Sequence, residues 1–226
     1  MDDPTLKRAV SGLLWLFVIM ATTLFLTTGT LQFWQGWLYL VVFFGSALAM
    51  TLDLAKNDPK LLERRSSGGP MAEGTIKQKI IMTFASAGFV ALLIVPALDH
   101  RFGWSAMPAS VSVIGDALFV ASYMAIIRVF RENTYAASTI AVAPGQRVIS
   151  SGPYAYVRHP MYAAGIVLLV ASPIALGSWW GLVVFFPLLP VIIWRLIDEE
   201  AFLRKNLSGY SEYCDRVRSR LVPFVW

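Results

Sequence analysis

Arg158 and His159 stand where they could bind an anion, directly before Pro160 and a long apolar stretch. Proline is favoured at the first position of a helix, so a helix is expected to begin here. A helix start has free backbone N–H groups and carries about half a positive charge. The sequence therefore predicts an anion site at this helix start. The alternative is that Arg158 only anchors the helix among lipid headgroups.

A second group of charged residues, Arg195 with Asp198, Glu199 and Glu200, follows the last apolar stretch. Arg195 and Glu199 are four positions apart and share a helix face, so a structural ion pair within the helix is one interpretation. A ligand-binding role is the other. The choice depends on which helix ends lie nearby.

The two apolar stretches 161–176 and 179–194 flank a tight connection at Gly177 and Ser178, which predicts a helical hairpin. In an antiparallel hairpin the start of the first helix and the end of the second lie together. We therefore expect the acidic cluster that follows Arg195 to lie beside Arg158 and His159. Opposite charges would then meet in one pocket.

Tyrosines are concentrated near both groups, at positions 154, 156, 162, 210 and 213. Tyrosine is common at membrane interfaces without any further function. Its ring face also attracts cations, with about 0.5 to 2 kcal/mol per contact. A ligand with a carboxylate, an ammonium and a second cationic centre would suit this set.

The elements that position these residues are membrane helices, because 57% of the 226 residues are hydrophobic and the charges are concentrated in a few segments. A bilayer core of about 30 Å needs about 20 apolar residues in a helix. We predict an all-α, polytopic fold with about six spans, a C-terminal helical hairpin and cytoplasmic interfacial helices. The expected spans are 10–28, 33–52, 80–98, 111–127, 161–176 and 179–194.

The basic residues predict the orientation, because Lys and Arg accumulate in cytoplasmic loops. Placing both termini in the cytoplasm leaves Arg101 as the one basic residue of nineteen on the outer side. The net charge of +5 is then mainly a signal of topology and argues against nucleic-acid binding. The single cysteine, Cys214, excludes an internal disulfide, and His100 and His159 would lie on opposite sides of the membrane, so we expect no metal site.

Two short interfacial helices are expected, over 60–65 and 210–217, each bounded by breaker residues. The loop 131–157 is long for a connection that crosses no membrane. Its apolar residues favour docking over disorder.

Residues 128–224 resemble the isoprenylcysteine carboxyl methyltransferase family of integral membrane proteins. The resemblance lies in the segments REN at 131–133, VISSGPYAYVRHPMYAAG at 148–165, RLIDEE at 195–200, YSEY at 210–213 and RLVP at 220–223. It implies a division of the chain into N-terminal transmembrane helices with a cytoplasmic loop, 1–110, and a cofactor-binding methyltransferase core, 111–226.

The resemblance also implies S-adenosyl-L-methionine as the cofactor, and it implies which residues form the site. Arg195 matches the family's substrate-orienting arginine, and Glu200 stands beside the family's carboxylate at Glu199. Glu200 or Tyr213 would act as a base if the methyl acceptor were an amine. The expected cofactor-binding residues are Gln146, Arg147, Val148, Ile149, Tyr154, Arg158, His159, Pro160, Met161, Tyr162 and Glu199.

The expected reaction is carboxyl methylation of a lipophilic acceptor, an isoprenylcysteine-like or related lipid that enters the site from the bilayer. A phospholipid N-methyltransferase is a close alternative. An NADPH-dependent membrane sterol or steroid reductase is another, although it would need a dense basic cluster for the extra phosphate. A small transporter or scaffold would need polar residues deep in the spans, where Asp116 is the one candidate.

Overall fold

A computed structural model describes residues 4–66 and 68–226, and over these residues the regular structure is entirely helical. In chain order the elements are α1 (Pro4–Thr28), α2 (Trp34–Asn57), α3 (Pro59–Ser66), the 3₁₀ turn η1 (Pro70–Ala72), α4 (Ile76–Phe102), α5 (Ala109–Glu132), the 3₁₀ turn η2 (Gly152–Ala155), α6 (Pro160–Ala175), α7 (Trp179–Asn206) and α8 (Tyr210–Arg216).

Five of these helices, α1, α2, α4, α5 and α7, are long and apolar enough to cross a membrane. The sixth, α6, is apolar but has only 16 residues. At 1.5 Å per residue its length is about 24 Å, which is less than the roughly 30 Å of a bilayer core. The predicted polytopic all-α fold is confirmed, with a sixth span that is shorter than a full crossing.

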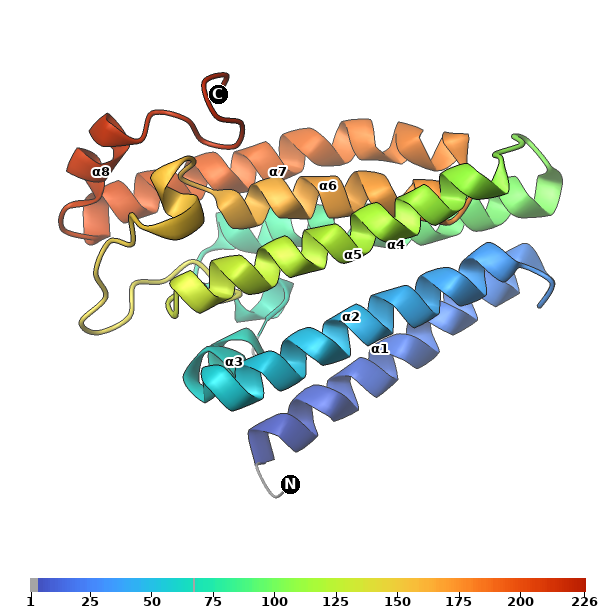
Figure 1. Cartoon of the computed structure of the whole chain (residues 1–226), viewed down its shortest axis with the longest axis horizontal. Helices are drawn as coiled ribbons and strands as arrows, with labels where there is room; N and C mark the ends of the chain where they lie inside the picture. Colours follow the sequence, from blue (N-terminus) through green and yellow to red (C-terminus); the bar gives the residue numbers. More distant parts are fainter. Residues whose placement is uncertain (1–3, 67) are drawn as a thin grey trace.

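The long helices run side by side along the longest axis of the molecule (Figure 1). The most extensive packing joins α5 to α6 and α4 to α7, and α1 packs against α2 and α4. The turn between α6 and α7 passes through Gly177 in the left-handed region, with φ of 74°. The predicted hairpin is confirmed, because α6 and α7 lie against each other.

Helices α5 and α6 approach closely at Gly115. A Cβ atom at this position would lie 2.4 Å from the backbone nitrogen of Ala175. Only glycine lets the two backbones come so near. A hydrogen bond of 3.1 Å from the Tyr39 hydroxyl to the Ser172 hydroxyl joins α2 to α6 in the same buried core.

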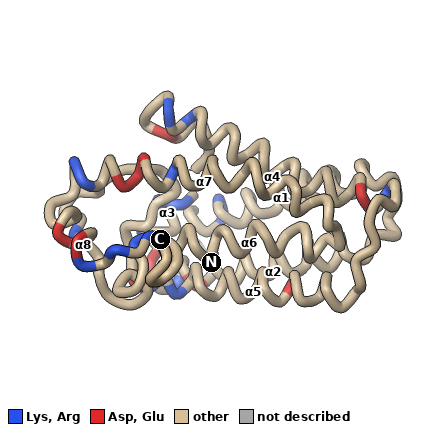
Figure 2. The backbone as a smooth tube through the Cα atoms, turned by 90° about the horizontal axis from the view of Figure 1, so that it is seen from above, with Lys and Arg blue, Asp and Glu red and all other residues tan. Residues whose placement is uncertain are grey.

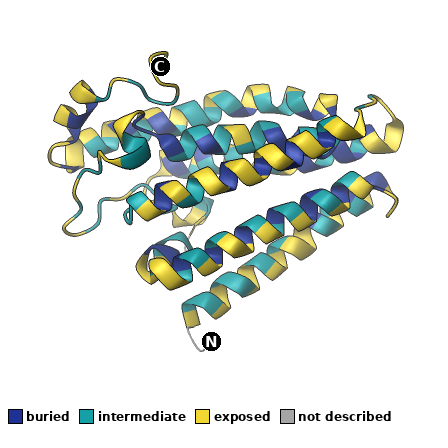
Figure 3. Ribbon diagram, viewed as in Figure 1, coloured by how far each residue is buried: buried dark blue, intermediate teal, exposed yellow. Residues whose placement is uncertain are grey.

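Charged residues gather at one end of the bundle, around α3 and α8, and are few at the other end (Figure 2). Large apolar side chains such as Leu14, Trp15 and Val18 are exposed along α1 (Figure 3). An exposed apolar face of this kind is what lipid would cover.

The two short helices pack onto the charged end of the bundle. Leu61 and Leu62 of α3 are buried with Val129 and Phe130 of α5. Helix α8 buries Tyr210, Tyr213 and Cys214 together with Leu207, which follows α7, and Val142 and Val148 of the long loop pack against this cluster. Both predicted short helices and the docking of the loop are therefore confirmed.

Candidate functional site

A cavity of about 330 Å³ lies at the charged end of the bundle. This volume is within the range of small-molecule sites, which is about 300 to 1,000 Å³. Its wall combines the loop after α5, η2, the start of α6, the end of α7 and α8. From the N-terminal part of the chain it also takes Arg65, Gly69 and Met82.

All eleven residues predicted to bind the cofactor line this cavity, as do Arg195 and Tyr213. Their assigned roles stay predictions. The eleven are Gln146, Arg147, Val148, Ile149, Tyr154, Arg158, His159, Pro160, Met161, Tyr162 and Glu199.

The start of α6 is fixed by the segment that follows α8. The backbone N–H of Arg158 donates to the carbonyl of Ser219, and that of His159 to the carbonyl of Arg220, each at 3.0 Å. Pro160 occupies the first position of the helix, as predicted. Residues 217–220, here called the tail segment, thus close one side of the site.

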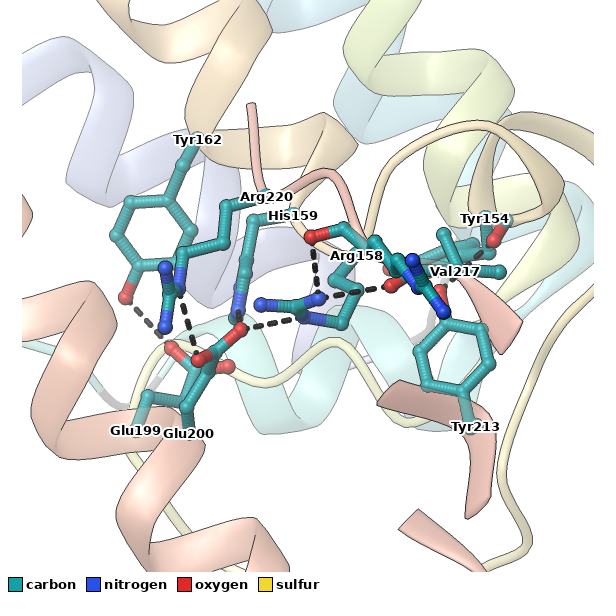
Figure 4. Close-up of polar contacts among 10 residues, drawn as sticks. Tyr154, Arg158, His159, Tyr162, Glu199, Glu200, Tyr213, Val217 and Arg220 are labelled. Atoms are coloured by element: carbon teal, nitrogen blue, oxygen red, sulfur yellow. Dashed lines mark hydrogen bonds and ion pairs between the residues drawn. The ribbon is translucent and has the colours of Figure 1, made fainter. Parts of the chain in front are cut away.

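Arg158 is buried and bonded on several sides (Figure 4). Its Nε donates to Glu200 Oε1 at 2.6 Å, and its Nη1 donates to the carbonyls of Val217 and Arg218 at 2.7 Å each. Burial alone would lower the pKa of Arg158, but the hydrogen bond and the charge of Glu200 raise it. The interpretation of Arg158 as a headgroup anchor is wrong, because only 4% of its side chain is exposed.

Glu200 holds this network together from α7. Besides Arg158, its Oε1 lies 3.2 Å from His159 Nε2, and its Oε2 accepts from Arg220 Nε at 3.0 Å. Glu200 itself is not among the residues that line the cavity. These contacts are those of a residue that positions Arg158 and His159, and its predicted catalytic role stays a prediction.

Glu199, one position earlier on α7, does line the cavity. Its Oε2 accepts a hydrogen bond of 2.6 Å from the Tyr162 hydroxyl, across from α6 (Figure 4). A step of one residue turns a helix by about 100°, which separates the surroundings of Glu199 from those of Glu200. The carboxylate that faces the cavity is therefore Glu199.

Arg195 bonds to groups from other elements. Its Nη2 donates to Glu73 Oε1 at 2.7 Å and to the Ser138 carbonyl at 3.1 Å, and its Nη1 donates to Gln78 Oε1 at 2.8 Å. These hydrogen bonds hold it against the loop after η1 and the start of α4, so the helix-internal pair with Glu199 is not its main attachment.

The expectation that the whole acidic cluster lies beside Arg158 and His159 is wrong for Asp198. It bonds to Lys77 and Gln78 at the start of α4. Of the expected acidic cluster, Glu199 and Glu200 face α6 and Asp198 faces α4.

Of the five tyrosines singled out in the sequence, four lie outside α6, and three of these four line the cavity. Tyr154, Tyr210 and Tyr213 line it, whereas Tyr156 does not and is 70% exposed. The Tyr213 hydroxyl donates to the Tyr154 carbonyl at 2.8 Å, and the Tyr154 hydroxyl accepts from Asn133 at 2.9 Å. Burial raises the pKa of Tyr154 to about 12, so this hydroxyl stays neutral.

Sequence reasoning missed the contribution of the N-terminal part. Arg65 on α3 and Met82 on α4 line the cavity, and Glu73 holds Arg195. One signal for this was available, namely the predicted short helix with two adjacent arginines at 64 and 65. The division of the chain at residue 110 stays a prediction, and the cavity takes residues from both sides of it.

Comparisons with known proteins match this chain to one family model and to individual relatives. Residues 110–209 match the family model described as phospholipid methyltransferase. The Delta(14)-sterol reductase of Mus musculus is 32% identical over 91 residues, which is 39% of this chain and 22% of that protein. The chain therefore spans about a fifth of the length of this relative.

Among solved structures, the eukaryotic intramembrane Ras methyltransferase, isoprenylcysteine carboxyl methyltransferase, covers 98% of this chain and 96% of its own, with 16% identity and a TM-score of 0.43. With an identity and a TM-score this low, the similarity supports no conclusion about function.

The fold defines a polytopic helical membrane protein with a ligand-sized cavity at one end of the bundle. Residues 110–209, which match the phospholipid methyltransferase family model, form most of that cavity.

Proposed function

We propose that this chain is an S-adenosylmethionine-dependent membrane methyltransferase that acts on a lipophilic acceptor. The observation that carries the proposal is that one cavity gathers all eleven residues expected to bind the cofactor. The family match over residues 110–209, found independently of that geometry, supports the same activity.

The cavity suits the charged groups of the cofactor. Glu199 is a carboxylate on the cavity wall that could bind the ammonium group of an amino acid. The first backbone N–H groups of α6 and His159 could bind the carboxylate. Tyr154, Tyr210 and Tyr213 offer ring faces and apolar surface to a sulfonium and an adenine.

When bound, the cofactor supplies an electrophilic methyl group. The protein would then act mainly by positioning the acceptor, which can contribute several kcal/mol to lowering a barrier. Arg195 is proposed to orient the acceptor, held in place by Glu73 and Gln78. Glu200 would fix Arg158 and His159.

A carboxylate is the acceptor that the site suits best, as in an isoprenylcysteine-like lipid. A carboxylate is already anionic at neutral pH and needs no base. An amine acceptor would need one, and the two candidates are engaged elsewhere, Glu200 with Arg158 and Tyr213 with the Tyr154 carbonyl. Burial raises the pKa of Tyr213, which makes it a poorer proton acceptor at neutral pH.

The shortness of α6 supports entry of the acceptor from the bilayer. The cavity lies at the start of a helix about 24 Å long, so its floor would be near or below the edge of a 30 Å hydrocarbon core. A lipid could then reach the site sideways. The basic residues at this end of the bundle support a cytoplasmic cavity with both termini on the same side.

The second candidate is a reductase, favoured by the sterol reductase similarity over 91 residues. It predicts binding of NADPH. Calorimetry on the purified full chain in detergent, with S-adenosylmethionine and NADPH titrated separately, distinguishes the two. Micromolar binding of S-adenosylmethionine, lost in Glu199→Gln, supports the proposal; binding of NADPH alone would overturn it. Incubating lipid extracts with methyl-labelled cofactor, followed by mass spectrometry, would identify the acceptor.

A further inference from the structure

Arg65 places a guanidinium on the wall of the cavity, on the side formed by α3. Its Nη1 donates to the carbonyl of Ala136 at 2.9 Å and lies 3.8 Å from the sulfur of Met161. Its Cζ lies 4.3 Å from the centre of the Phe130 ring. These contacts hold the side chain in one orientation.

The charge of Arg65 has no acidic partner in the described part of the chain. No carboxylate there lies within 4 Å of its guanidinium, and its Nε and Nη2 make no hydrogen bond within residues 4–66 and 68–226. Burial lowers the pKa of Arg65 to about 10, which reflects the cost of keeping this cation away from water. A desolvated cation without a counterion is unfavourable, so an anionic ligand group would be stabilised here.

The place of Arg65 in the cavity indicates which ligand carries that anion. One part of the cavity wall consists of Leu207, which follows α7, Tyr210 and Tyr213 of α8, and the loop residue Val148. Val148, Tyr210 and Tyr213 in this part of the wall are among the residues proposed to contact the cofactor. Arg65 belongs to another part of the wall, next to the apolar cluster of α2, α3 and α5, and it contacts Met161, which is also predicted to bind the cofactor. A lipophilic acceptor would meet this second part of the wall on leaving the membrane.

We propose that Arg65 is an anion-binding subsite for the acceptor, receiving a carboxylate or a phosphate while the acyl or prenyl chain lies among the membrane helices. This inference rests on the proposed function, because it assumes that an acceptor occupies the cavity. It assigns a part in substrate recognition to the N-terminal part of the chain. A guanidinium that binds either anion by paired N–H groups is well suited to it.

Arg64 provides a matched control. It is the preceding residue on α3, is also partly buried and also donates to the backbone, at 2.7 Å to the Thr134 carbonyl. It does not line the cavity. Arg64→Met therefore removes one cation and one backbone contact from the same helix without touching the proposed subsite.

The experiment compares anionic and neutral probes on the full chain in an uncharged maltoside detergent. The probes are N-acetyl-S-farnesylcysteine, its neutral carboxamide and farnesyl monophosphate, each titrated by calorimetry without cofactor. Wild type should bind the carboxylate or the phosphate about tenfold or more tightly than the amide, as expected for a charge-assisted hydrogen bond. The headgroup is identified as the anion whose affinity exceeds that of the amide by the larger factor.

Arg65→Met should abolish this preference, Arg65→Lys should retain part of it, and Arg64→Met should retain all of it. The ratio of affinities within one variant does not depend on how much of that variant is folded. Equal affinity of wild type for the acids and the amide would overturn the proposal, and so would equal losses in Arg64→Met and Arg65→Met.

Titration of S-adenosylmethionine and NADPH against the same variants separates this subsite from the cofactor site. An Arg65→Met variant that loses either cofactor and keeps its preference for anionic probes would reassign the residue to the cofactor and overturn the inference. If wild type binds no S-adenosylmethionine but shows the Arg65-dependent preference, the proposed function fails and the anion subsite stands.

Discussion

The guanidinium of Arg158 and the carboxylate of Glu200 form a buried ion pair, with 2.6 Å between Nε and Oε1 and side chains only 4% and 5% exposed. The pair joins the start of α6 to α7, 42 positions apart in the chain. His159 and Arg220 bond to the same carboxylate. One residue of α7 thereby fixes the helix start and the tail segment, so its loss should affect folding before it affects chemistry.

Replacing Glu200 by Ala should lower the free energy of unfolding by about 3 to 5 kcal/mol, because it leaves the charge of Arg158 buried without a partner. The double change Arg158→Met with Glu200→Leu should recover part of this loss. Thermal unfolding in detergent measures both, with the exposed Glu212→Gln as the control. An unchanged unfolding midpoint together with lost turnover in Glu200→Gln would instead make Glu200 a catalytic residue.

Tyr162→Phe should weaken cofactor binding about three- to tenfold, because it removes the hydrogen bond that orients Glu199. Glu199→Gln should cost more, about 10- to 100-fold, since it removes the charge that would face the ammonium group. Calorimetry with S-adenosylmethionine measures both constants. A larger loss from Tyr162→Phe than from Glu199→Gln would contradict this order.

Arg195→Ala should reduce turnover more than cofactor binding, and Glu73→Gln should reproduce much of that effect, because Glu73 holds the arginine in place. We expect kcat to fall about tenfold in Glu73→Gln while the Kd for the cofactor stays within about twofold. Glu63→Gln, an exposed change on α3, is the control. Equal losses in turnover and in cofactor affinity would argue against a role toward the acceptor.

Cys214 should react slowly with maleimide in the folded protein, because it is only 4% exposed and burial raises the pKa of its thiol. Arg220→Ala should speed the labelling by roughly tenfold, since it loosens the tail segment that covers this region. Arg218→Ala, an exposed change in the same segment, should leave the rate near that of wild type. Fast labelling of the wild type would show that α8 is loosely packed.

Gly115→Ala should lower the thermal midpoint, because the added Cβ would lie within 3 Å of the α6 backbone, which would have to move. Gly45→Ala is the matched change, in a helix and with open space around the new methyl group. It should be neutral or stabilising by up to about 1 kcal/mol, as alanine favours the helix. Similar midpoints for the two variants would refute the close approach of α5 and α6.

The sequence was sufficient for the spans and for the C-terminal part of the cavity wall because both depend on local patterns. Apolar runs define the long helices, and Pro160 with the short turn at Gly177 defines the hairpin. The hairpin then requires His159 and Glu199 to share one end of the bundle.

Contacts that depend on rotation and on long-range packing could not be predicted in this way. Neighbouring positions on a helix differ by about 100°, so the sequence did not distinguish the cavity-facing Glu199 from the buried Glu200. No sequence pattern predicts that α3 packs so that Arg65 lies beside Met161, 96 positions later in the chain. Such partners are set by how the helices pack.

Arg158 is synthesised well before the residues that bind it, because these partners lie far along the chain. The carbonyls of the tail segment that bind Arg158 come 59 and 60 residues after it, and Glu200 comes 42 residues after it. At about 5 to 20 residues per second, the ribosome takes about 2 to 8 s to supply the counterion. The buried network at the start of α6 can therefore form only after α7 and the tail segment have been made, so Arg158 stays hydrated until late in synthesis.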